Sequence, residues 1–214
     1  MIIIACLDAV MVVHNAFRRD ISEIDQAVHE KTRQGGDLSS VIDRLQYFGG
    51  IIDRHEKGEE QAVFPDLDRV LSPLLAPLFT DDHREISEGV SKIVDAPDEL
   101  AAARASAALH SQVQIHLAKK DTHLYSALRD RIDLAQQAEI VGQLWGRAFP
   151  PDDVLPQYMN WLYRHVNQED QATITNVWKY LMSEEDFAKC VPLIKEAVTT
   201  NDWSELTKRV PGMA

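Results

Sequence analysis

Four long segments of this chain carry apolar side chains at alternating spacings of three and four residues, the period of an amphipathic α-helix. The first of these stripes comprises Leu7, Val10, His14, Phe17, Ile21 and Ile24. The others lie within residues 41–62, 83–93 and about 98–129, and Gly- or Pro-containing breaks separate the four. Four amphipathic helices joined by short connections predict an antiparallel four-helix bundle.

The composition changes near residue 130. Seven of the eight His lie between His14 and His123, whereas all four Trp follow residue 140. Shorter helices are expected near 136–147, 152–166, 167–182, 184–198 and 201–208. We therefore predict an all-α protein with a four-helix bundle over residues 1–130 and a smaller helical extension over 131–214.

Charge and motif content exclude several classes of function. The chain has 34 acidic and 22 basic residues, a formal charge of −12, so its surface repels phosphate backbones and no nucleic-acid partner is expected. No apolar run approaches the ~20 residues of a membrane span, and the two Cys form no disulfide framework, so a cytoplasmic protein is expected. Phosphate-binding loops, nucleophile elbows and Cys-x-x-Cys pairs are absent.

Each of the four stripes contains one histidine where a leucine would pack better. These residues are His14, His55, His83 and His116. A buried imidazole without a partner is costly, so four of them need a common explanation. His55 and Glu59 are four residues apart, about 40° around one helix, so both can reach one centre. Imidazole and carboxylate from facing helices hold iron or manganese in bundle cores, and the sequence therefore predicts a metal site.

Over residues 5–130 the ordered set of polar residues resembles the hemerythrin-like HHE cation-binding domains. The residues that carry the resemblance are His14, His55, Glu59, Glu60, Phe64, Pro65, Asp82, His83, His116 and Tyr125. The rest of the chain looks, more loosely, like the helical extension that follows some bacterial HHE domains and occurs in plant iron-sensing HHE proteins.

The resemblance implies a non-haem di-iron centre that meets O₂, peroxide or NO. His14 and His55 would then bind one iron, His83 and His116 the other, and Glu59 would bridge them. Glu56 is nominated as a further ligand, since some members use the carboxylate directly after this histidine. The predicted function is a non-haem iron protein that reacts with or senses these small ligands. The alternatives are a di-iron oxidase or oxygenase with a small-molecule substrate, and a mononuclear or metal-poor sensor.

The fourth helix departs from the family pattern. Lys120 stands where the family usually has Glu, and Asp121 stands at the position used by the oxygen carriers. Ser87 stands where the oxygen carriers have a second histidine, which argues against reversible oxygen carriage. Lys120 then has three interpretations. It points to solvent while Asp121 supplies the bridge, which we favour from sequence; its ammonium lies inside and replaces one cation; or it is a reactive amine.

Two further residues are expected to modify the site. His123 follows His116 by two helical turns on nearly the same face, and is interpreted as an outer hydrogen-bond donor, a core residue or an unusual extra ligand. Glu60, beside Glu59 in the motif, is expected to act from outside the metal's coordination sphere.

Overall fold

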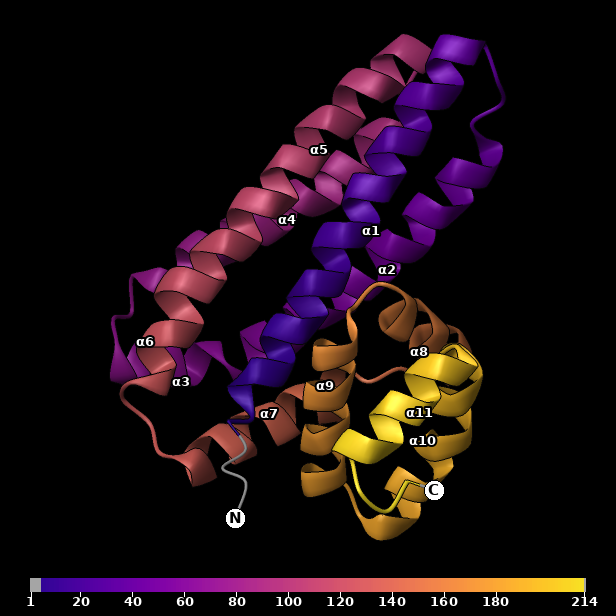
Figure 1. Ribbon diagram of the computed structural model, residues 1–214. Helices are drawn as coiled ribbons and strands as arrows, with labels where there is room; N and C mark the ends of the chain where they lie inside the picture. The colour runs from indigo at the N-terminus through magenta and orange to yellow at the C-terminus, as the bar shows by residue number, and fades with distance from the viewer. Residues whose placement is uncertain (1–4, 214) are drawn as a thin grey trace. The chain divides into compact units, whose positions relative to one another are not determined.

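The computed structural model describes residues 5–213, and the regular structure of these residues is helical throughout (Figure 1). The elements are α1 (Leu7–Gln34), α2 (Ser39–Ala62), α3 (Phe64–Val70), α4 (Leu75–Val94), α5 (Glu99–Lys119), η1 (Lys120–Tyr125), α6 (Ser126–Arg129), α7 (Leu134–Ala148), α8 (Leu155–Arg164), α9 (Gln168–Leu181), α10 (Glu184–Ala197) and α11 (Thr200–Arg209). The all-α prediction is confirmed. Among the described residues, no helix combines the length and apolar character that crossing a membrane requires.

The chain divides into two compact units. One comprises residues from Phe17 to Arg131, and the other combines the residues up to Ala16 with those from Ile132 onward. The start of α1 thus groups with the C-terminal segment and not with the rest of its own helix. Asn15 contributes to this grouping, because its Nδ2 donates to Asp170 Oδ2 at 3.2 Å.

In the unit from Phe17 to Arg131, α4 packs against both α2 and α5, and these helices lie lengthwise beside one another (Figure 1). Gly89 lies at the close contact between α4 and α5, where an added Cβ would come within 2.8 Å of Leu109 Cδ1 and the leucine side chain would have to move. Phe17 and Phe48 meet edge to face in the core, with ring centroids 5.8 Å apart. The stripes predicted from sequence therefore form the apolar interior that holds these helices together.

The helix predicted over about 98–129 has a different internal geometry. The α-helix α5 ends at Lys119, and the six residues of η1 form a π-helical turn before α6 begins. A π-helix has hydrogen bonds from residue i to i+5, so each turn holds more residues than an α-helical turn. Every side chain after Lys119 therefore points in a different direction from the one α-helical spacing predicts.

The unit that contains α7 to α11 has its own aromatic core. Trp178 is fully buried, and its ring meets those of Trp145 and Phe149 edge to face at 5.8 and 5.7 Å. Side-chain caps begin four of its helices, at Asp133, Asn167, Ser183 and Thr199. These caps satisfy backbone N–H groups that the first helical turn leaves without partners.

Candidate metal centre

Three buried side chains from three helices converge in the unit from Phe17 to Arg131. Glu56 comes from α2, His83 from α4 and His116 from α5. Each offers one ligand atom, and these atoms lie within 4.8 Å of one another. Among the described residues, neither Glu56 Oε1 nor His83 Nε2 has a hydrogen-bond partner. Buried polar atoms without partners are costly, so this group has the character of a site for a cation.

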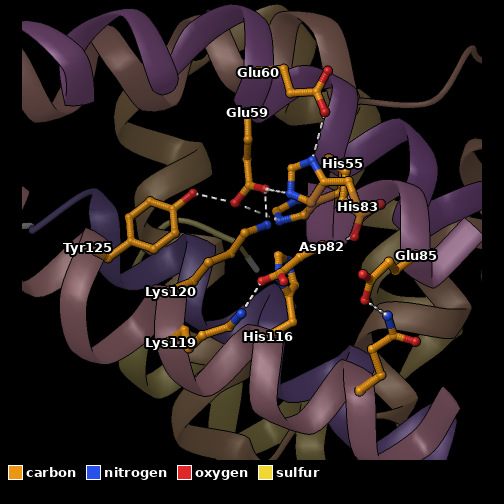
Figure 2. Close-up of polar contacts among 12 residues, drawn as sticks. His55, Glu59, Glu60, Asp82, His83, Glu85, His116, Lys119, Lys120 and Tyr125 are labelled. Carbon is orange, nitrogen blue, oxygen red and sulfur yellow. Dashed lines mark hydrogen bonds and ion pairs between the residues drawn. The ribbon is translucent and has the colours of Figure 1, made fainter. Parts of the chain in front are cut away.

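Carboxylates fix the far side of both imidazole rings. His83 Nδ1 lies 2.8 Å from Glu60 Oε1, and His116 Nδ1 lies 3.0 Å from Asp82 Oδ2 (Figure 2). Lys119 also binds the Asp82 carboxylate. A carboxylate accepts a hydrogen bond from Nδ1–H, which leaves the Nε2 lone pair of each ring for a ligand. This arrangement orients histidines in metal sites and strengthens them as donors.

Burial favours the uncharged forms of both Glu56 and His83. Burial raises the pKa of Glu56 well above its ordinary value, although the charge of Lys120 acts in the opposite direction. Burial lowers the pKa of His83 to about 2, and here the charge of Lys120 adds to the effect. His83 is therefore a neutral imidazole near pH 7, and the ionised form of Glu56 gains from a nearby cation.

The second candidate group lies one turn further along α2. His55 Nε2 and Glu59 Oε1 are 3.3 Å apart, and the Glu59 side chain is fully buried. Both oxygens of this carboxylate accept from protein donors: Lys120 Nζ binds Oε2, and Tyr125 Oη donates to Oε1 at 2.6 Å (Figure 2). Glu59 is thus already compensated by groups of the chain itself.

The structure corrects the interpretation of Lys120 and Asp121 that we favoured from sequence. Lys120 is fully buried and paired with Glu59, so it does not point to solvent. Asp121 instead accepts from Arg18 Nη2 at 2.6 Å at the partly exposed surface. The bridging role expected of Asp121 is wrong, because its carboxylate is held by Arg18.

The π-helical turn explains these placements. Residues five apart on an α-helix are about 140° apart, whereas the hydrogen-bonding of a π-helix brings them back to one face. Lys120 and Tyr125 therefore both reach Glu59. His123, expected to share the face of His116, is exposed instead, so the core position considered for it is wrong. Sequence reasoning also missed the Tyr125 hydroxyl as a donor; burial of a tyrosine, whose O–H then needs a partner, is the signal that could have found it.

His14 is fully buried on α1. It precedes Phe17 by one turn of the same continuous helix, so both residues share a helical face. The ring of Phe17 lies 5.4 Å from that of His55. The burial predicted for all four stripe histidines is confirmed, since each is at most 6% exposed.

Two surface grooves reach the Glu56 group from either side of α4. One, of about 430 Å³, is lined by Gly50, Glu56 and Ser87 among others. The other, of about 540 Å³, is lined by Asp82, His116 and Lys119 among others. Ligand residues thus form part of the wall of each groove, so a small molecule could approach them from solvent.

Comparison of the chain with models of protein families, with curated proteins and with solved structures found no match in any of the three. The donor set itself is what points to a chemistry. Imidazole nitrogen and carboxylate oxygen together suit iron, manganese and zinc, whereas magnesium and calcium prefer oxygen alone. The buried His and Glu side chains could therefore hold a transition-metal ion.

Proposed function

We propose that the protein binds iron at its buried His/Glu groups and reacts with or senses O₂, peroxide or NO. The observation that carries this proposal is the Glu56 group. Glu56 Oε1 and His83 Nε2 are buried without hydrogen-bond partners among the described residues, while a carboxylate holds the outer nitrogen of His83. A core that served packing alone would not orient imidazole nitrogens toward a bare carboxylate oxygen.

We further propose that α1, α2, α4 and α5 form an antiparallel four-helix bundle of the hemerythrin-like kind. The packing of α4 against α2 and α5 supports this arrangement. So does the resemblance of the motif residues, including His55, Glu59 and His83. The resemblance also includes His14, which is fully buried on α1.

In this proposal each part of the chain has a defined task. Iron would supply the redox chemistry with the small ligand. Glu56, His83 and His116 would hold it, and Glu60 and Asp82 would fix the two rings. Aromatic rings exclude water on one side, since Phe64 stacks on His83 at 5.6 Å and Phe79 meets His116 at 6.2 Å.

The groove beside Glu56 favours a second candidate, an oxidase or oxygenase acting on a small polar molecule. Gly49 and Gly50 line it without side chains, and Asp53, Ser87 and Ser91 add polar groups. A substrate bound there would lie against the carboxylate that holds the metal.

Metal content tests the proposal directly. The protein should hold iron or manganese after reconstitution, and its optical spectrum should change on addition of peroxide or NO. His83→Ala should reduce metal affinity more than about 100-fold, because even loss of an outer partner costs 10–100-fold. His123→Ala is the matched control, since that histidine is exposed and its removal should leave binding unchanged. Equal metal content in His83→Ala and wild type would refute the assignment.

A further inference from the structure

We propose that the ammonium of Lys120 takes the place of a second metal, so that each chain binds one metal ion, held by Glu56, His83 and His116. Glu59 is then the counter-ion of Lys120 and not a bridging ligand. The inference rests on the proposed function, because it specifies how the metal is bound. It departs from the di-iron centre that the resemblance implies.

The contacts of Glu59 carry the first step. Its two oxygens accept from Lys120 and Tyr125, and all three side chains are fully buried. A metal bound to Glu59 would compete with these donors for the lone pairs of the carboxylate. An ammonium or hydroxyl that lost this competition would be left in the core without its partner, which is unfavourable.

Charge carries the second step. Lys120 neutralises Glu59 within the core, and a divalent cation bound beside the same carboxylate would meet the buried ammonium at short range. Repulsion between cations is strong where the dielectric is low. The ammonium of Lys120 is paired with Glu59 and not with Glu56, although its charge acts on both Glu56 and His83, and Glu56 Oε1 has no hydrogen-bond partner among the described residues.

The donor set of the remaining group is chemically complete. Two histidines and one carboxylate are the protein ligands of mononuclear non-haem Fe(II) sites that keep coordination positions open for other ligands. Glu56, His83 and His116 supply this set from three separate helices. One metal with open positions beside a groove therefore needs no contribution from Glu59.

The backbone geometry of η1 positions the ammonium of Lys120. Lys120 begins the π-helical turn and Tyr125 ends it, and this geometry brings both donors to one carboxylate. π-helical turns occur frequently at functional sites. The π-helical turn thus places the buried ammonium of Lys120 where it compensates Glu59.

Metal stoichiometry of the full-length chain tests the proposal. Wild type loaded with Mn²⁺ should bind about one ion, with the hyperfine-split paramagnetic resonance signal of an isolated ion. Lys120→Met should free Glu59 and raise the count to about two, with a coupled signal. Lys57→Met, on an exposed lysine of α2, is the matched control and should stay at one.

The outcomes separate the two proposals. About two ions in wild type, or an unchanged count in Lys120→Met, would overturn the role of Lys120 and leave metal binding intact. Less than about 0.1 ion in wild type would refute the proposed function itself. If Lys120→Met does not fold, Glu59→Gln decides: retention of one ion within about tenfold of wild-type affinity supports the proposal, and loss of the ion overturns it.

Discussion

The two His/Glu groups are built from similar parts and differ in what compensates the carboxylate. Glu56 and Glu59 lie one turn apart on α2, and both are buried. Glu59 receives an ammonium and a phenol from the turn that follows α5, whereas Glu56 has an oxygen without a hydrogen-bond partner among the described residues. One buried carboxylate of α2 thus receives its hydrogen bonds and compensating charge from the chain itself, whereas the other keeps an oxygen that an external cation could bind.

Removal of the ammonium that compensates Glu59 should have the largest effect on stability. Without metal, Lys120→Met should lower the free energy of unfolding by about 3–5 kcal/mol, because it leaves the charge of Glu59 buried and alone. Denaturant titration in a chelator measures this. The double variant Lys120→Met/Glu59→Gln should recover most of the loss, and Lys57→Met should stay within about 0.5 kcal/mol of wild type. No recovery in the double variant would show that the pair is not the source of the stability.

Filling the uncompensated group should stabilise the protein. Ferrous or manganous ion at one hundred times its dissociation constant should raise the free energy of unfolding by about 2.7 kcal/mol. A chelator should reverse the change. Glu56→Gln should show no gain at the same metal concentration, and an equal gain in that variant would place the metal elsewhere.

Disturbing the outer contacts of the Glu56 group should have an intermediate effect. Asp82→Asn removes the charge that holds His116 and should weaken metal binding about 10–100-fold. Glu85→Gln is the control, because this carboxylate of the same helix is exposed and contacts Gln112 instead. Competition titration against a chromophoric chelator gives both affinities, and equal values would count against an orienting role for Asp82.

Removal of the Tyr125 hydroxyl should have the smallest effect on stability. Tyr125→Phe removes one of the two donors to Glu59 and should lower the stability of the metal-free protein by about 1.5 kcal/mol. Lys120 keeps the charge compensated, so the metal count should remain at one. Tyr180→Phe removes an exposed hydroxyl and should have no measurable effect; thermal unfolding of both variants makes the comparison.

The sequence was sufficient to predict that the chain is helical and that the four stripe histidines are buried. Apolar spacing reports which face of a helix is covered, so a polar residue such as His83 or His116 within a stripe could be assigned to the interior. The α2 spacing of His55 and Glu59 was equally readable, because that helix is regular. The predicted helix starts were less accurate, since α4 begins at Leu75, several residues before the stripe.

The π-helical turn and the surroundings of the start of α1 could not be predicted, because residue spacing does not reveal backbone geometry or tertiary contacts. An extra residue in a turn leaves no compositional mark, so α-helical counting misplaced His123 and favoured a bridging Asp121 over a buried Lys120. Likewise a stripe shows that α1 is covered along its length, but not which elements cover its start. The pairing of Asn15 with Asp170, 155 positions away, is of that kind.

The π-helical turn also determines which changes of chain length the site can accept. Removal of a single codon, for instance that of Thr122 within η1, would return the segment to α-helical register. Tyr125 would then lie four residues after Lys120, about 40° around the helix axis, so both donors would stay on the face that meets Glu59. A chain with this architecture can therefore lose its extra residue by an in-frame deletion and keep both donors of its core.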